Sequence, residues 1–202
     1  MTPAFTAQPL PQDIAEKING VTYRPNPDIK LSELYYLKLG YIDFEGNTQT
    51  GEMICNKKLA SELLEIFKEL YEVKYPIEKI RLADEYGGDD DLIMGDNNSS
   101  CFNYRTIADT NTVSLHGLGR AVDINPLYNP YIVGEKVMPS NAAPYADRTK
   151  DFPHKIDEKD ICYKIFTRHG WKWGGAWTNS KDYQHFYKPD GKVKRLIAKL
   201  LK

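Results

Sequence analysis

The pattern of apolar and polar positions in the first half of the chain predicts a hairpin followed by an amphipathic helix. Apolar and aromatic side chains are dense over residues 34–44, Glu45-Gly46-Asn47 is a turn signal, and residues 49–55 form the returning strand. Asn56 is the predicted N-cap of a helix that Tyr75-Pro76 ends. The apolar residues of this helix recur at helical spacing: Leu59, Leu63, Ile66, Phe67 and Leu70.

The remaining segments alternate between short elements and irregular stretches. Residues 1–30 contain five prolines and are predicted to form an extended N-terminal arm with a short helix over 13–19, which leaves 31–202 as a single domain. Strands are predicted at 79–84, 100–106 and 181–188, and a second helix at 157–169. The acidic segment 86–100 does not have EF-hand spacing and is predicted to be a solvated loop. Residues 125–153 are expected to be irregular, and the chain closes with a basic amphipathic tail.

Composition indicates an ordinary globular protein and argues against several classes of partner. The 202 residues are 41% hydrophobic and 27% charged, and the net charge of -1 creates no field that would favour nucleic acid. No run is apolar enough to span a membrane, and no signal peptide is visible, although a chain trimmed of its leader would look the same. Cys55, Cys101 and Cys162 are predicted to be small buried hydrophobes, with one oxidised pair as the alternative.

A hydrolytic metal site is predicted from two segments that lie far apart in the sequence. His116 and Asp123 flank two glycines and an apolar run, an arrangement that can place an imidazole on a turn and a carboxylate on the following strand. His185 completes two histidines and one carboxylate, the ligand set of a catalytic zinc site. Asp182 can act as a general base beside it, and Arg105 can stabilise an oxyanion or clamp a substrate carboxylate.

These two motifs also resemble a known family. Ser114-x-His116-x-x-Gly119-x-Ala121-x-Asp123 followed by Asp182-x-x-His185 is similar to the zinc D-alanyl-D-alanine carboxypeptidase and L-alanyl-D-glutamate endopeptidase family, which includes vancomycin-resistance D,D-dipeptidases and phage endolysins. The resemblance covers a catalytic core of about residues 100–190. It implies one zinc ion held by His116, Asp123 and His185, with Asp182 as the general base. It further implies that Arg105 polarises the scissile carbonyl and that Ser114 touches substrate.

The resemblance also implies a fold and bears on specificity. The implied fold is α+β, a small and mostly antiparallel sheet flanked by helices, as in D,D-peptidases and hedgehog domains. Trp173 and Trp177 lie close to Asp182 in sequence and are predicted to wall the substrate cleft, with core packing as the alternative. Aspartate rather than glutamate at position 182 favours the endopeptidase branch, whereas Tyr187 stands where many relatives have an acid.

The expected function is hydrolysis of a peptide bond next to a D-amino acid in peptidoglycan stem peptides. The protein is expected to be a monomer that acts outside the cytoplasm, at the cell wall. Carboxypeptidase and endopeptidase activity both stay open. The alternative from another class is a zinc-containing, non-catalytic wall-binding module, against which the presence of Asp182 argues. A third possibility is hydrolysis of some other small D-amino-acid peptide.

Overall fold

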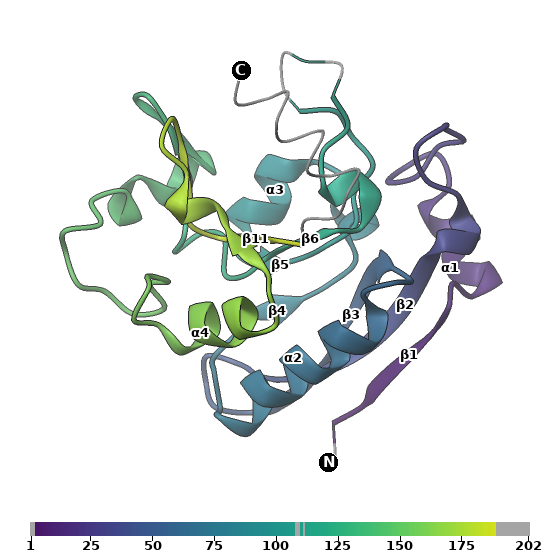
Figure 1. Cartoon of the computed structure of the whole chain (residues 1–202), viewed down its shortest axis with the longest axis horizontal. Helices are drawn as coiled ribbons and strands as arrows, with labels where there is room; N and C mark the ends of the chain where they lie inside the picture. The colour runs from purple at the N-terminus through teal and green to yellow at the C-terminus, as the bar shows by residue number, and fades with distance from the viewer. Residues whose placement is uncertain (1–2, 108–109, 111, 189–202) are drawn as a thin grey trace.

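An antiparallel hairpin with a long helix packed across it forms the base of the fold (Figure 1). The computed structural model describes residues 3–107, 110 and 112–188. In it, β2 (Leu34–Ile42) pairs with β3 (Thr48–Asn56), so the predicted hairpin is confirmed. Side chains alternate between the two faces of this sheet. Leu37 and Leu39 lie in the same core as helix α2 (Ala60–Glu72), and the other face meets the Phe102 cluster, which consists of Ile18, Tyr23, Ile29, Leu34, Tyr36, Ile54, Leu82 and Phe102.

Helix α2 matches the predicted apolar pattern but begins later than predicted. Its inward residues are fully buried: Leu63, Ile66, Phe67 and Leu70. The prediction of Asn56 as its N-cap is wrong, because Leu59 occupies that position. Asn56 instead ends β3, and its side-chain Nδ2 donates to the carbonyl of Leu118 at 3.2 Å. It therefore holds the loop that carries His116 rather than the helix.

The N-terminal segment is attached to this base at two points. β1 (Phe5–Pro9) pairs with β2 in antiparallel register, and α1 (Gln12–Ile18) buries Ile18 in the Phe102 cluster. Lys17 on α1 also pairs with Asp84, with 3.2 Å between Lys17 Nζ and Asp84 Oδ2. The short predicted helix is confirmed. The division of the chain into an arm over 1–30 and a domain over 31–202 stays a prediction.

The acidic segment is more ordered than a solvated loop, so that prediction is wrong. Between β4 (Lys79–Ile80) and β5 (Asn98–Ser99), which pair in parallel, the chain forms the 3-10 helix η2 (Ala83–Tyr86) and helix α3 (Asp90–Gly95). Asp89 caps α3, its carboxylate accepting from the N–H groups of Asp91 and Leu92. The strand predicted at 79–84 shortens to β4, and the one predicted at 100–106 is reduced to isolated bridges.

Two small sheets in the second half of the chain position the predicted site residues. One has the order β6-β11-β9, from β6 (Ala121–Asp123), β11 (His185–Tyr187) and β9 (Lys172–Trp173). The other has the order β10-β7-β8, from β10 (Lys181–Asp182), β7 (Tyr131–Val133) and β8 (Lys136–Met138). The strand predicted at 181–188 is therefore divided between two sheets. The stretch predicted to be irregular contains β7, β8 and the 3-10 helix η4 (Ser140–Tyr145).

Helix α4 (Ile161–Arg168) covers the core beside α2 (Figure 1). It is shorter than the predicted helix at 157–169, because Asp160 is its N-cap and accepts from the N–H of Cys162 at 2.8 Å. Ile165 and Phe166 face the core. The predicted basic tail lies outside the described residues.

The α+β prediction is confirmed, and the described strands pair antiparallel except for β4 and β5. The three cysteines are buried and free, as predicted. Within the described ranges, no helix has both the length and the apolar character needed to cross a membrane.

Candidate metal centre

His116 is oriented by the backbone on the far side of its ring. It begins the 3-10 turn η3 (His116–Leu118), and its Nδ1 lies 2.6 Å from the carbonyl oxygen of Cys101. A carbonyl oxygen only accepts, so Nδ1 carries the proton and Nε2 presents a lone pair on the opposite edge of the ring. The hydroxyl of Ser114 accepts from the N–H of His116 at 3.3 Å and supports the same turn.

Gly119 fixes this turn against the end of β3. Its backbone φ is +61°, in the left-handed region, and its carbonyl accepts from the N–H of Asn56 at 2.9 Å. A Cβ at this position would lie 2.5 Å from the backbone N of Asn56 and 2.9 Å from the carbonyl carbon of Cys55. Both the conformation and the close approach therefore require glycine, and they determine where His116 stands.

Asp123 and His185 face one another across two antiparallel strands. β6 ends at Asp123 and β11 begins at His185, and the two residues are direct register partners. His185 Nδ1 lies 3.0 Å from Asp123 Oδ1, and His116 Nε2 lies 3.2 Å from Asp123 Oδ2. The two ring nitrogens, His116 Nε2 and His185 Nδ1, are 3.1 Å apart. Residues far apart in the sequence are thus brought to one point inside the protein.

The three residues form a triangle whose ligand atoms are spaced about as a zinc ion requires. Zinc bonds to nitrogen and oxygen are about 2.0–2.1 Å long, which places two ligands of a tetrahedron about 3.3 Å apart. The two ring nitrogens are 3.1 Å apart, and each lies 3.0 or 3.2 Å from its own oxygen of the Asp123 carboxylate. His116 Nε2 also directs a lone pair at a carboxylate, an arrangement that only a proton or a cation makes favourable. The donor set fits zinc.

The two histidines keep Asp123 ionised. Burial alone raises the pKa of this carboxyl group, but His116 and His185, when both imidazoles are protonated, outweigh burial through their charges and hydrogen bonds and hold the pKa well below its usual range. Since a carboxylate must be deprotonated to bind a metal, this environment prepares Asp123 as a ligand.

Asp182 lies beside the triangle and is not part of it. Its Oδ2 is 4.0 Å from His185 Nδ1, and its Oδ1 is buried with no hydrogen-bond partner among the described residues. Burial raises the pKa of Asp182 to about 7. The charge of His185 lowers this pKa, and the charge of Asp123 raises it further. A carboxyl group with a pKa near neutrality and one unpartnered oxygen is suited to exchanging a proton with a bound molecule.

Gly174 allows the tryptophan-rich segment to pass directly behind Asp182. A Cβ on Gly174 would lie 2.7 Å from the carbonyl oxygen of Asp182 and 3.3 Å from the Cβ of His185. Trp173 is buried and donates its Nε1 proton to the carbonyl of Tyr183 at 2.9 Å. Trp177 is half-buried, and its ring centroid lies 5.4 Å from that of His185. Trp177 therefore contacts the centre, while Trp173 is mainly a core residue.

Arg105 is held by a carboxylate from the segment that the sequence predicted to be a loop. Asp90, the first residue of α3, forms an ion pair with the Arg105 guanidinium and accepts from Asn103 Nδ2 at 3.2 Å with its other oxygen. The backbone of Arg105 lies against Gly117, the residue after His116, where a Cβ on Gly117 would be 3.4 Å from Arg105 N. The charges of Arg105 and Asp90 both act on the pKa of Asp182. Arg105 Nε is buried without a hydrogen-bond partner in the described part of the chain.

The structure thus brings the three predicted ligands and Asp182 together, with Arg105 and Trp177 at the edge. The roles predicted for Ser114 and Trp173 in substrate binding stay predictions, since both side chains are buried and have structural contacts. Two contributors were missed. Asp90 stands in a run of three aspartates that no pattern distinguishes, and the Cys101 carbonyl belongs to the backbone, which carries no sequence signal.

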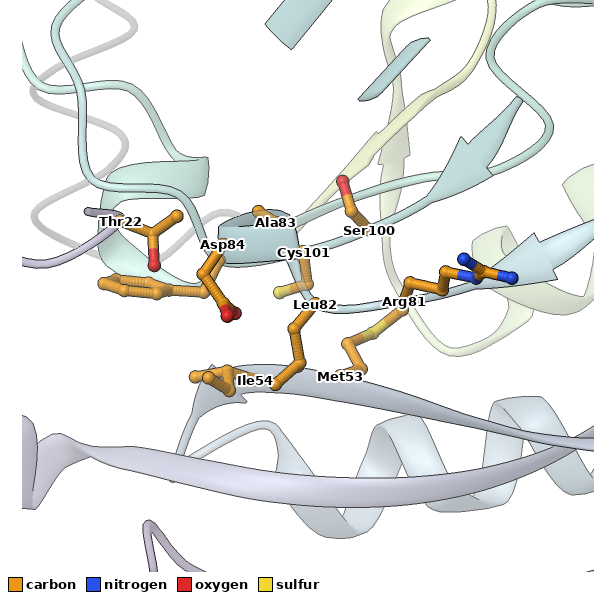
Figure 2. A pocket seen from close by; sticks show the side chains of 10 residues that line it. Thr22, Met53, Ile54, Arg81, Leu82, Ala83, Asp84, Ser100 and Cys101 are labelled. Carbon is orange, nitrogen blue, oxygen red and sulfur yellow. The ribbon is translucent and has the colours of Figure 1, made fainter. Parts of the chain in front are cut away.

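A small cavity lies beside residues 100–102, which follow β5. Figure 2 shows the carboxylate of Asp84 close to Ile54 and Leu82, with Cys101 above them. The cavity measures about 10 Å³, which is room for a single water molecule. One oxygen of Asp84 is buried there without a hydrogen-bond partner among the described residues, and one water would satisfy it. A peptide cannot enter this cavity.

Comparison with known proteins agrees with the motifs. The sequence model of the D-alanyl-D-alanine carboxypeptidase family matches residues 108–188, and this confirms the resemblance identified in the sequence. The matched segment contains His116, Asp123, Asp182 and His185, and Arg105 lies just before it. Searches of curated proteins and of solved structures found no match to the chain.

Proposed function

From the family match over residues 108–188 and the ligand triangle inside it, we propose that this protein is a zinc peptidase acting on peptidoglycan stem peptides. The proposed reaction is hydrolysis of a peptide bond next to a D-amino acid. One observation carries the proposal: two histidine nitrogens and the Asp123 carboxylate lie at about zinc spacing, with the unpartnered oxygen of Asp182 beside them. A zinc ion with three protein ligands keeps one position for water or substrate, as in catalytic sites.

The chemistry divides between the metal and the chain. A zinc ion held here supplies Lewis acidity, which lowers the pKa of a water molecule to about 7 and polarises a carbonyl oxygen. Asp182 takes the proton of the attacking water on Oδ1 and returns it to the departing amine. Arg105, held in place by Asp90, directs its positive charge at the carbonyl oxygen as that oxygen becomes negative. Trp177 forms a wall of the site and limits access of water.

Two bonds of the stem peptide are candidates. Cleavage of the terminal D-alanyl-D-alanine bond would release free D-alanine, and cleavage of the L-alanyl-D-glutamate bond would create a new N-terminal D-glutamate. The short side chain of Asp182 favours the second. The proposed place of action is the cell wall, where this substrate lies, and the protein is proposed to act there as a monomer.

The test is incubation of zinc-loaded protein with purified peptidoglycan, followed by mass spectrometry of the released products. The expected result is one of the two products above, abolished by a chelator and restored by zinc. Asp182→Asn, which keeps the size of the side chain but removes the base, is expected to retain zinc and lose hydrolysis. Unchanged muropeptides from zinc-loaded wild-type protein would refute the peptidase and favour the wall-binding module. Full activity in Asp182→Asn would refute the mechanism alone.

A further inference from the structure

We propose that an aromatic pocket next to the candidate metal centre binds a sugar ring of the glycan strand that carries the stem peptide. This inference rests on the proposed function and adds a second part of the substrate to it. The pocket measures about 430 Å³, within the range of about 300–1,000 Å³ typical of ligand sites. It is lined mainly by Tyr163, Thr167, Lys172, Trp173, Trp177 and Tyr187.

The pocket is continuous with the centre through two aromatic rings. The centroid of Trp177 lies 5.4 Å from that of His185, and the ring of Tyr187 stacks on His185 at 5.7 Å. His185 and Tyr187 are two positions apart on β11, so their side chains share one face of the strand. Trp177 Nε1 donates to the hydroxyl of Tyr187 at 3.3 Å and ties the two rings together. A ligand in the pocket therefore lies about one ring width from a metal ligand.

The lining combines flat apolar faces with polar groups, the combination that a pyranose ring requires. The C–H face of a sugar packs on an aromatic ring while its hydroxyl groups form hydrogen bonds at the edge. Tyr163 and Trp173 meet edge to face at 5.3 Å and so form a corner of two differently oriented rings. The Tyr187 hydroxyl accepts from Trp177 and keeps its own proton to donate. Thr167 donates to the carbonyl of Tyr163 at 2.7 Å, which leaves its oxygen as an acceptor.

Lys172 adds a positive charge to this lining. It is exposed on the edge strand β9, opposite Tyr187, and no carboxylate of the described residues forms an ion pair with it. Its ammonium group offers three donors, and the hydroxyl and ring oxygens of a sugar accept hydrogen bonds. Lys172 therefore adds donors to the polar edge of the pocket, beside the Thr167 oxygen and the Tyr187 hydroxyl.

The position of the pocket also bears on which bond is cut. In peptidoglycan the stem peptide is joined to the sugar through its L-alanine, so the sugar lies one residue from the L-alanyl-D-glutamate bond. The terminal D-alanine is several residues farther away. A sugar pocket one ring width from His185 therefore fits cleavage at L-alanyl-D-glutamate and does not fit cleavage at the terminal bond.

The test compares two substrates that differ only in the sugar: a free stem peptide and the same peptide attached to its disaccharide. For zinc-loaded wild-type protein we expect kcat/KM to be about tenfold higher with the sugar attached, through a lower KM. Lys172→Ala and Tyr163→Leu are expected to bring this ratio close to one. Lys164→Ala is the matched control, since Lys164 is exposed on α4 but does not line the pocket, and it should keep the wild-type ratio.

A binding measurement separates this proposal from the peptidase itself. The peptide-free disaccharide of N-acetylglucosamine and N-acetylmuramic acid, with its carboxyl group blocked as an amide to match the substrate, is titrated into nitrogen-15-labelled protein, and the indole N–H signals are followed. The indole signal of Trp177, which is half-buried and lines the pocket, should shift, whereas that of Trp171, which is buried and does not line the pocket, should not. Sugar binding without hydrolysis would support the pocket and refute the peptidase. The sugar pocket would be overturned if the peptide with and without its disaccharide were hydrolysed with equal kcat/KM and the indole signals did not shift. It would also be overturned if Lys172→Ala and Tyr163→Leu lowered kcat/KM equally for both substrates.

Discussion

Gly119 provides a test of how tightly zinc binding is coupled to one backbone contact. Gly119→Ala places a methyl group 2.5 Å from the backbone N of Asn56, about 1 Å closer than a favourable contact. Gly134→Ala is the matched control. Gly134 has a similar φ of +57°, and a Cβ there would have no heavy atom within 4 Å. The two variants share the conformational cost and differ only in the clash.

The expected magnitudes follow from these two terms. A left-handed alanine costs about 1–2 kcal/mol, and this is the whole effect expected for Gly134→Ala. In Gly119→Ala the clash must also separate Asn56 from Gly119, which breaks their 2.9 Å hydrogen bond and adds about 1–3 kcal/mol. His116 lies in the same turn, three residues away, and metal-ligand distances tolerate only about 0.2 Å. We therefore expect zinc affinity to fall about 10–100-fold, the usual cost of disturbing the support of a ligand.

The assays are chemical unfolding of the zinc-free proteins and competitive zinc titration against a chelator. Gly119→Ala should be less stable than Gly134→Ala by about 1–3 kcal/mol and should bind zinc more weakly than wild type, while Gly134→Ala binds it normally. Equal stability of the two variants, or unchanged zinc affinity in Gly119→Ala, would show that the contact with β3 does not position His116.

Three further results are expected. Asp90→Asn should lower kcat/KM about 10–100-fold without changing zinc affinity, because Arg105 loses its ion pair. Asp91→Asn, one residue along α3, should leave kcat/KM near wild type, and equal effects of the two variants would contradict a specific role of Asp90 in holding Arg105. Burial raises the pKa of Asp160, the N-cap of α4, to about 6 in the folded protein, whereas in the unfolded chain this pKa is about 4. As the pH rises from about 4 to about 6, only the unfolded chain loses this proton readily, so the free energy of unfolding falls over that range. Asp160→Asn keeps the helix cap but cannot ionise, so its stability does not depend on this proton. The free energy of unfolding of the variant minus that of wild type should therefore rise between pH 4 and pH 7 by at most about 3 kcal/mol, and a constant difference would refute the raised pKa of Asp160. Finally, zinc should raise the Tm of wild-type protein but not of His185→Ala, as measured by calorimetry, and an equal rise in both would exclude the proposed centre.

The parts of the fold that the sequence predicted well are those decided by neighbouring residues. The hairpin of β2 and β3 and the apolar face of α2 follow from local periodicity, and both are found. The end of β3 shows the limit of such reasoning. Asn56 has the right chemistry for a helix cap, but its backbone N–H and side-chain amide bind the turn at Leu118 and Gly119, more than sixty residues away. A long-range contact outweighs the local preference there.

The candidate site divides in the same way. The side chains of His116, Asp123 and His185 could be grouped from the sequence because few residue types bind zinc, and their order and spacing were informative. Their supports could not be predicted. Asp90 gains its importance only because α3 brings it to Arg105, and the strand predicted over 181–188 divides because Asp182 pairs with β7 while His185 pairs with β6.

The pairing of Asp123 with His185 sets the moment in synthesis at which the centre can form. A growing chain can fold β1 to β3 and α2 early, since domains form from the N-terminus while translation continues. His116 and Asp123 are made well before β11, which begins more than sixty residues after Asp123. Until that strand aligns with β6, no third ligand is present. Any hydrolysis by the proposed centre would therefore begin only after β11 has docked on β6.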